Sequence, residues 1–285
     1  MDPDARNGWQ LAQHEGAQEL RAPGDAPGRG LRADWSQLRL PDGASALRGQ
    51  PLGRAVGSAA HTAIDATAGL GFDSFAMAAM GVQVRAIERN DWVLALLRQA
   101  HAWALADAKL KPIAERITIE QGDAHALLAA AQPVDVVLLD PMFPAKKKAD
   151  AKPPKAMQAL SAVVGDDGDA DALLMLALAV ARQRVVVKRA RHAPPLGNLQ
   201  RAWTIEGKVL RFDVYRALAR TAPAASQTQS THRKTTRPRR MRQGRGLSKC
   251  SQDQARRRRV ARPAKPISAA APGAGTARYR LLIVE

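Results

Sequence analysis

The sequence predicts an α/β fold built on a mostly parallel sheet with an antiparallel hairpin at its edge. From about residue 60, short apolar runs rich in β-branched residues alternate with longer helical stretches, which is the pattern of strands covered on both faces. Strand, helix and strand in repeated order require parallel pairing with right-handed crossovers. Two more strand-like runs, separated by Glu206-Gly207-Lys208, end the pattern as a hairpin.

Each expected element follows from this alternation. The strands of the parallel part are expected at residues 63–66, 82–88, 117–121, 134–140 and 184–189. The helices that connect and cover them are expected at residues 73–80, 91–106, 124–131, 155–163 and 169–183. The edge hairpin is expected to pair residues 203–205 with residues 209–217.

Composition divides the chain of 285 residues into three parts. Residues 1–33 are rich in Gly, Pro, Arg, Gln and Ala without a sustained period, and we expect them to be disordered. Residues 34–219 form the α/β domain. Residues 220–285 hold 17 basic and 2 acidic residues and have no pattern that would form a core. Two interpretations of this tail stay open: an RNA-binding arm, or a solvated extension that the function does not need.

The composition also excludes several classes of protein. The only cysteine, Cys250, lies in the basic tail, which excludes a disulfide framework and a cysteine-based zinc site for the domain. A reducing, cytoplasmic setting therefore fits best. The longest apolar run, residues 172–181, is much shorter than the roughly 20 residues of a membrane span. Because no histidines have a metal-like spacing and no kinase or serine-nucleophile motif occurs, we expect no metal cofactor.

The first strand leads into a glycine-rich turn that runs directly into a helix. The turn reads Asp65-Ala-Thr-Ala-Gly69-Leu-Gly71, and glycines at the carboxyl end of a strand let a ligand approach the backbone closely. The third glycine of the dinucleotide fingerprint would fall at Ser74, and the carboxylate of Asp65 would repel a pyrophosphate. The turn therefore disfavours NAD and suits a cationic ligand.

Carboxylates follow the next two strands. Glu88 comes 17 positions after Gly71, where an acidic residue in this fold accepts hydrogen bonds from both ribose hydroxyls of an adenosine ligand. Asp123 follows the third strand, where it can accept from an adenine amino group or cap the next helix. Each acid alone is more often a cap or a surface charge, but acids at three successive strand ends indicate a nucleoside site.

The fourth strand delivers the most informative motif, Asp140-Pro141-Met-Phe143-Pro. Asp140 and the Pro141 carbonyl can accept the two N–H bonds of an exocyclic amine, while Phe143 stacks on the base that carries it. Methylating such a nitrogen requires its lone pair to be aimed at a methyl donor, so positioning carries most of the catalysis. Without the upstream acids, the same residues would be a rigid turn that ends a strand.

Basic side chains follow this motif and end the fifth strand. A charge run is usually a solvated loop, but here it adjoins the expected pocket, which favours contact with the phosphates of RNA. The residues expected to bind RNA are Lys146, Lys147, Lys148, Lys188 and Arg189.

These segments together resemble the ribosomal RNA small subunit methyltransferase J family. The similar segments are residues 65–71, 88–90, 139–144, 164–165, 185–189, 193–196 and 211–215, within a resemblance that covers about residues 51–215. The family comprises bacterial enzymes that use S-adenosylmethionine (SAM) to methylate the N2 amine of a guanine in 16S rRNA. The resemblance implies a class I, Rossmann-like methyltransferase that binds SAM and acts on 16S rRNA or the small ribosomal subunit in the cytoplasm.

The resemblance and the motifs together define an expected site. Its catalytic residues are Asp140, Pro141 and Phe143. Its cofactor contacts are Asp65, Gly69, Gly71, Phe72, Asp73, Glu88, Arg89, Asp123, Ala124 and Asp140. Phe72 is a departure, since the family is expected to have arginine there. Two alternatives stay open: an N-methyltransferase acting on adenine or on a protein glutamine, and a catalytically dead RNA-binding protein.

Overall fold

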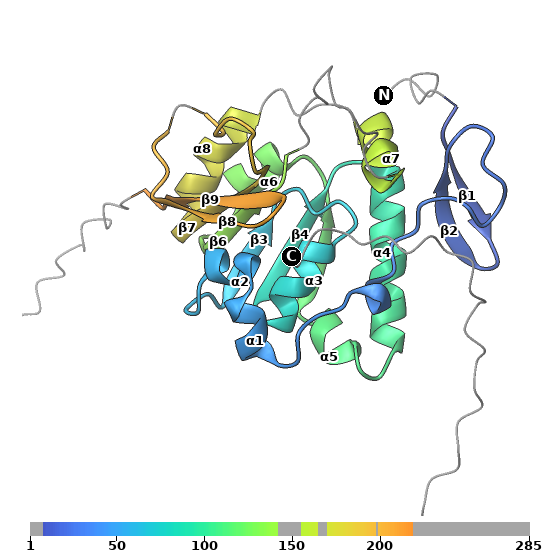
Figure 1. The fold of residues 1–285 in the computed structure, drawn as a ribbon, viewed down its shortest axis with the longest axis horizontal. Coiled ribbons are helices and arrows are strands. Elements are labelled where there is room, and N and C mark those ends of the chain that lie inside the picture. Colours follow the sequence, from blue (N-terminus) through green and yellow to red (C-terminus); the bar gives the residue numbers. More distant parts are fainter. Residues whose placement is uncertain (1–7, 142–154, 165–169, 198, 219–285) are drawn as a thin grey trace, which may run out of the picture. The chain divides into compact units, whose positions relative to one another are not determined.

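The computed structural model describes residues 8–141, 155–164, 170–197 and 199–218. A seven-stranded sheet forms the centre of this part of the chain, with strand order β5-β4-β3-β6-β7-β9-β8 (Figure 1). Its parallel strands are β3 (Thr62–Asp65), β4 (Gln83–Glu88), β5 (Ile117–Gln121), β6 (Val134–Leu139) and β7 (Ala181–Ala190). The antiparallel edge consists of β8 (Trp203–Glu206) and β9 (Leu210–Arg216). The predicted sheet and its edge hairpin are therefore confirmed.

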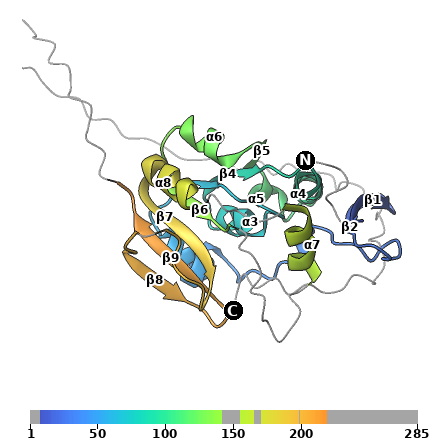
Figure 2. The same ribbon diagram turned by 90° about the horizontal axis from the view of Figure 1, so that it is seen from above.

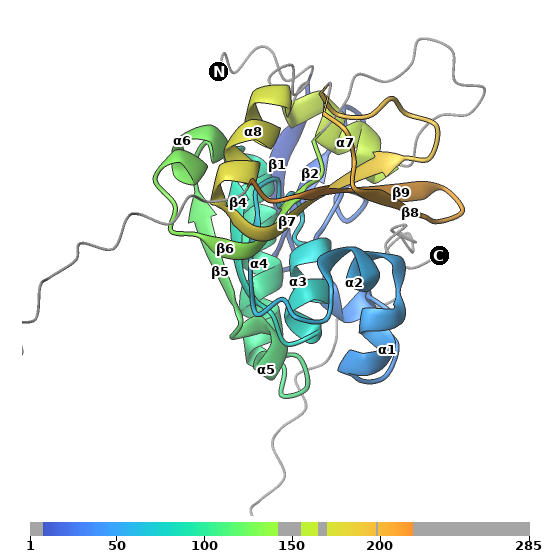
Figure 3. The same cartoon turned by 90° about the vertical axis from the view of Figure 1, so that its left-hand side faces the viewer.

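Helices cover both faces of the sheet (Figure 2). One face carries α6 (Ala124–Ala129) and α8 (Ala170–Val180). The other face carries α3 (Phe72–Ala79), α4 (Asp91–Ala106), α5 (Lys111–Ala114) and α7 (Lys155–Val164). Two short helices, α1 (Ala44–Gly49) and α2 (Pro51–Val56), pack beside α3, and α2 also contacts β8 and β9 at the antiparallel edge (Figure 3).

The strands are apolar on both sides because each face of the sheet packs against helices. Successive side chains of a strand point to opposite faces, so Ile64 packs against the α6 and α8 side while its neighbour Ala63 packs against the α3 and α4 side. In the same way Val185 and Val187 belong to one cluster and Val186 to the other. This double burial explains why the strands read as continuous apolar runs in the sequence.

The largest difference from a predicted boundary lies between α8 and β7. The helix expected at residues 169–183 ends at Val180, and β7 begins at Ala181 without a connecting turn. Ala181 already pairs with Val134 of β6. The strand therefore takes over the residues that the sequence pattern assigned to the last turn of the helix, because pairing along β6 outweighs the local preference for a helix.

The N-terminal segment is a second correction, because residues 8–33 are ordered. Strands β1 (Gln10–His14) and β2 (Ala17–Arg21) form an antiparallel hairpin whose turn includes Gly16 at a φ of 75°. Leu20 and Leu31 are fully buried, and the buried Glu19 carboxylate accepts hydrogen bonds from Gly28 N and the Arg32 guanidinium. The segment is stabilised by paired charges and a few buried leucines. Because it needs so few apolar residues, its composition resembles that of a disordered chain.

The remaining parts of the predicted organisation fall outside the described ranges. Residues 1–7 and the basic tail, residues 220–285, belong to this group, so the two interpretations of the tail stay predictions. Within the described ranges, none of the helices combines the length and the apolar character that crossing a bilayer requires.

Candidate active site

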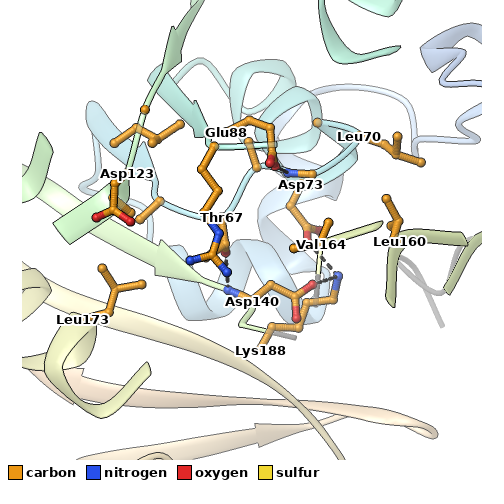
Figure 4. A pocket seen from close by; sticks show the side chains of 18 of the residues that line it. Thr67, Leu70, Asp73, Glu88, Asp123, Asp140, Leu160, Val164, Leu173 and Lys188 are labelled. Carbon is orange, nitrogen blue, oxygen red and sulfur yellow. Dashed lines mark hydrogen bonds and ion pairs between the residues drawn. The ribbon is translucent and has the colours of Figure 1, made fainter. Parts of the chain in front are cut away.

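A pocket opens where β3, β4, β5 and β6 end, at the edge of the sheet where open α/β folds bind ligands (Figure 4). Nine of the ten residues expected to contact the cofactor line it. They are Gly69, Gly71, Phe72, Asp73, Glu88, Arg89, Asp123, Ala124 and Asp140. The site predicted from separate segments of the sequence is therefore brought together by the topology of the sheet.

Hydrogen bonds between neighbouring strand ends hold this edge together. Ala68 N donates to the carbonyl of Ile87 at 2.9 Å, and Gly122 N donates to the carbonyl of Glu88 at 3.1 Å. Asp140 N donates to the hydroxyl of Thr67 at 2.6 Å. Each contact links a loop to the end of an adjacent strand, so the polar side chains that follow these strands are fixed relative to one another.

The glycine-rich turn packs closely against the helices behind it. Gly71 has a φ of 78° and precedes the first residue of α3. A Cβ at this position would lie 2.4 Å from Leu97 Cδ1 and 2.7 Å from Trp35 Cζ2, which leaves no room for a side chain. Trp35 also donates from its indole nitrogen to the carbonyl of Leu70 at 2.9 Å. The sequence gives no sign of this support, because Trp35 lies 35 residues away from the turn.

Asp65 does not line the pocket, which corrects its assignment as a cofactor contact. Its side chain is 1% exposed and accepts a 2.6 Å hydrogen bond from the hydroxyl of Ser74 and a weaker one from Thr67 N. Burial raises the pKa of the Asp65 carboxyl to about 7, although the hydrogen bond from Ser74 opposes this rise. Asp65 therefore braces the turn through Thr67 and Ser74 and does not face the pocket.

Glu88 lies in the pocket wall with most of its surface covered. Oε2 accepts a hydrogen bond from Gly69 N at 3.0 Å, and Oε1 accepts one from Asn90 N at 2.7 Å. Burial raises the pKa of the Glu88 carboxyl to about 7, while these backbone N–H groups act in the opposite direction. The carboxylate is therefore held in one orientation beside the glycine turn, where its remaining lone pairs can accept from ligand hydroxyls.

Asp123 caps a helix and also lines the pocket. Its carboxylate accepts from His125 N at 2.8 Å at the start of α6, which confirms one of the two roles that the sequence left open. About half of the side chain is exposed, and it lies on the opposite side of the pocket from Asp73 (Figure 4). Capping uses Oδ1, so Oδ2 can still accept a hydrogen bond from a ligand.

The floor of the pocket contains an ammonium between two carboxylates (Figure 4). Lys188 Nζ lies 2.7 Å from Asp73 Oδ2 and 3.0 Å from Asp140 Oδ2. Burial alone would lower the pKa of Lys188, but the two carboxylates outweigh it and raise that pKa above its ordinary value. Desolvation raises the pKa of Asp140, and Lys188 limits the rise. Lys188 is therefore charged, and both acids are bound to it.

The position of Lys188 corrects a prediction. Lys188 and Arg189 were expected on an exposed RNA-binding rim, but only 11% of the Lys188 side chain is exposed. Arg189 is 4% exposed, and its guanidinium donates to the carbonyl of Pro194. Both side chains turn inward because buried acceptors lie within reach, and a paired charge tolerates burial. The signal in the sequence was the position of Lys188 directly after three valines, at the end of a central strand.

The other predicted catalytic and RNA-binding residues are only partly described. Pro141 is buried directly after Asp140. Phe143, Lys146, Lys147 and Lys148 lie outside the described residues, so their roles stay predictions.

The pocket has the chemical character that SAM requires. Asp73 Oδ1 is buried and has no hydrogen-bond partner among the described residues, so it is an open acceptor for a cationic group. Apolar side chains that the sequence did not identify line the rest of the pocket and suit an adenine ring. They are Leu70, Ile87, Leu160, Val164 and Leu173. Carboxylates that can bind the cationic groups of SAM and an apolar wall that can hold its adenine ring together fit this cofactor.

Comparison with known proteins shows which family the chain belongs to. The family described as "Putative SAM-dependent methyltransferase" matches residues 3–217. Ribosomal RNA small subunit methyltransferase J of Dechloromonas aromatica is 41% identical over 205 residues, which are 70% of this chain and 82% of that protein. The protein of the same name from Thioalkalivibrio sulfidiphilus is 42% identical over 204 residues, which are 69% of this chain and 79% of the relative.

A solved structure extends the agreement to the fold. The crystal structure of a SAM-dependent methyltransferase from Neisseria gonorrhoeae is 29% identical, has a TM-score of 0.58, and is matched over 81% of this chain and 89% of that one. Its fold is that of a class I methyltransferase, as the resemblance to the family implied. The chain is therefore a SAM-dependent methyltransferase and belongs to the ribosomal RNA small subunit methyltransferase J family.

Proposed function

We propose that this enzyme transfers the methyl group of SAM to the exocyclic N2 amine of a guanine in 16S rRNA, as free rRNA or in the small ribosomal subunit, in the cytoplasm. The observation that carries the proposal is the position of Asp140, at the end of β6 and on the floor of the pocket beside Asp73. The names of the relatives, which specify ribosomal RNA of the small subunit, support the choice of substrate.

Some residues of the pocket would bind SAM, the methyl donor, and others would bind the guanine amine that accepts the methyl group. Bound SAM would supply an electrophilic methyl group on a positively charged sulfur. When N2 bonds to this methyl, the S–CH3 bond breaks, S-adenosylhomocysteine is left, and the amine loses one N–H proton to solvent. Glu88 and Asp123 would accept hydrogen bonds from the ribose and adenine groups of SAM, and Asp73 Oδ1 would accept one from the ammonium of its methionine part. Asp140 would accept an N–H bond of the target amine and thereby turn its lone pair out of conjugation with the ring. Catalysis on this basis consists of holding the amine and the methyl group in the orientation in which they react.

The test is methyl transfer to defined substrates. Protein is incubated with methyl-labelled SAM and, separately, 16S rRNA, small ribosomal subunits, DNA and an extract of proteins. Label recovered as N2-methylguanosine in 16S rRNA supports the proposal. Label found instead as methyladenine or in protein glutamine would replace it with the corresponding N-methyltransferase. If no substrate is labelled, calorimetry with SAM decides between an inactive preparation that binds the cofactor and a dead RNA-binding protein, for which no binding heat is expected.

The ionisation of Glu88 leads to a prediction about pH. Because its pKa is about 7, lowering the pH from 8 to 6 protonates the carboxylate and removes an acceptor for the ribose hydroxyls. The dissociation constant of SAM should therefore rise by up to about tenfold per pH unit below 7. Calorimetry across this range measures it, and Glu88→Gln should weaken binding at pH 8 while flattening the dependence on pH.

The stability of the ligand-free enzyme should change in the opposite direction. The folded pKa of Glu88 lies above the ordinary value of 4.5, so the folded state binds the extra proton between those two values. Its contribution to stability is present below about pH 4.5 and is lost as the pH rises through 7. As the pH rises, SAM affinity should therefore increase while this contribution to stability decreases. If Glu88→Gln showed the same pH dependence of both as the unmodified enzyme, Glu88 would not be the group responsible.

A further inference from the structure

We propose that Lys188 is a positioning residue for methyl transfer, because its ammonium contacts both Asp73, which would bind SAM, and Asp140, which would hold the target amine. This inference rests on the proposed function, in which these two carboxylates serve different reactants. It adds a residue that acts through its neighbours and that no motif in the sequence assigned to this task. The three residues come from α3, β6 and β7, so a single side chain links three separate elements.

The geometry of the sheet places Lys188 between the two acids. Leu139 and Val187 are paired in the parallel register of β6 and β7, so Asp140 and Lys188 are the next residues at the same level of adjacent strands. Asp73 lies in the first turn of α3, above the same edge. The side chains of Lys188 and Asp73 are each 11% exposed, whereas that of Asp140 is 41% exposed. Lys188 is therefore buried, while the carboxylate of Asp140 is open toward the pocket.

The contacts use one oxygen of each carboxylate. Lys188 Nζ contacts Oδ2 of Asp73 and Oδ2 of Asp140. The second oxygen of Asp73 is buried without a partner among the residues described, which suits it to a cationic ligand group. With one oxygen of each acid fixed by the same ammonium, the remaining oxygens keep a constant separation. That separation sets the distance between the groups that bind the donor and the amine to be methylated.

The charge of Lys188 also favours the ionised form of Asp140. Asp73 of α3 raises the pKa of Asp140 and of Asp65 behind the turn, while Lys188 and Arg189 of β7 lower the pKa of Asp140. Without the ammonium, only Arg189 would oppose desolvation and the neighbouring acid. The pKa of Asp140 would then rise further, so its carboxylate would accept an N–H bond from the target amine over a narrower range of pH.

Lys188→Met tests the proposal, since methionine keeps an unbranched side chain of similar length and removes the charge. The first readout is the titration of aspartate carboxyl carbons by NMR in the ligand-free protein. We expect the titration of Asp140 to move upward by about one pH unit or more, as expected when an adjacent opposite charge is lost. The second readout is the pH profile of kcat on 16S rRNA, whose acidic limb should move by the same amount, with kcat at pH 7 lowered at least about tenfold.

Two further variants sharpen the test. Lys188→Arg retains the charge and should keep the acidic limb at its original position. Asp73→Asn removes one carboxylate without changing its shape, so it should move the titration of Asp140 downward. Lys111, an exposed lysine on α5 that pairs with Glu115, provides the matched control: Lys111→Met should leave both readouts unchanged.

The outcomes separate this inference from the proposed function. If Lys188→Met is folded and neither the titration nor the acidic limb moves, the inference is wrong, even when the melting temperature falls. If Lys188→Met does not fold, an unmoved titration in Asp73→Asn overturns it instead. If the unmodified enzyme fails to methylate 16S rRNA, the proposed function fails. The NMR titration of the ligand-free protein then still decides whether Lys188 controls Asp140.

Discussion

Asp140→Ala is expected to lower turnover by roughly 10²- to 10⁴-fold, which is the range for loss of a group that orients or polarises the reacting atom. Asp140 is the acid of the pocket that follows β6, and its carboxylate is open toward the space beside the glycine turn. Its removal takes away the acceptor that would hold the target amine. The dissociation constant of SAM should change only a few-fold, because Asp73, Glu88 and Asp123 stay in place.

Measurement of kcat and of SAM affinity on the same preparation is needed to interpret this variant. Lys188 loses one of its two carboxylates in Asp140→Ala but keeps Asp73 at 2.7 Å, so the pocket floor should stay folded. Asp42 is an exposed aspartate that does not line the pocket, and Asp42→Ala should behave like the unmodified enzyme. Full turnover in Asp140→Ala would show that the amine is oriented by other groups. An equal loss in the dissociation constant would make Asp140 a cofactor ligand.

The sheet was predictable from the sequence because the chain repeats one physical pattern. Residues 136–139 and 185–187, which are buried on both faces of the sheet, form continuous apolar runs in the sequence. The alternation also predicted β5 and α4 with their observed ends. The pattern is less informative where two elements meet without a turn residue, as at Ala181 between α8 and β7. There the pairing with β6 decides the boundary, and that pairing is not a local property of the sequence.

The sequence predicted most of the residues at the site, but not which of their side chains are buried and which face the pocket. Strand ends of a parallel sheet converge at one edge, so placing Glu88, Asp123 and Asp140 together needed only the order of the elements. Whether a side chain faces the ligand depends on packing behind the loop. Two predictions were wrong for different reasons. Asp65 was expected to contact the cofactor but is buried behind the glycine turn, where it binds Ser74. Lys188 was expected to bind RNA but is buried, where it pairs with Asp73 and Asp140.

Trp35, just after the N-terminal segment, shows a different limit of sequence analysis. Its indole contacts the glycine turn from 35 residues upstream. Such a contact has no periodic pattern, and the surrounding residues are those of a flexible chain. The evidence for it lies in Gly71, since a position without room for a Cβ must have a neighbour that fills the space.

Gly71→Ala is therefore expected to destabilise the enzyme by about 2–5 kcal/mol, from the left-handed backbone and from overpacking together. The new Cβ would meet Leu97 and Trp35 well inside normal contact distance. Because Gly71 also lines the pocket, relief of the clash would shift the turn and weaken SAM binding at least about tenfold, as for loss of one or more hydrogen bonds to the ligand. Urea denaturation and calorimetry measure the two effects.

Gly81 separates the two causes of this loss. It has a φ of 90°, similar to that of Gly71, but no atom lies within 4 Å of its Cβ position. Gly81→Ala should therefore cost only about 1–2 kcal/mol for the backbone, with SAM binding unchanged. The difference between the two variants is the packing contribution. Equal losses of stability would mean that the turn has room for a side chain and that Gly71 is required for its backbone conformation alone.

A double variant tests the contact itself. Leu97→Ala opens a cavity beside Gly71 and should by itself cost about 2–5 kcal/mol. In that background the new methyl of Gly71→Ala enters the space that Leu97 Cδ1 occupied, so the combined loss should be smaller than the sum of the single losses by about 1 kcal/mol or more. Strict additivity would place the Cβ away from Leu97. A subadditive result would establish that the helix α4 supports the turn that binds the cofactor.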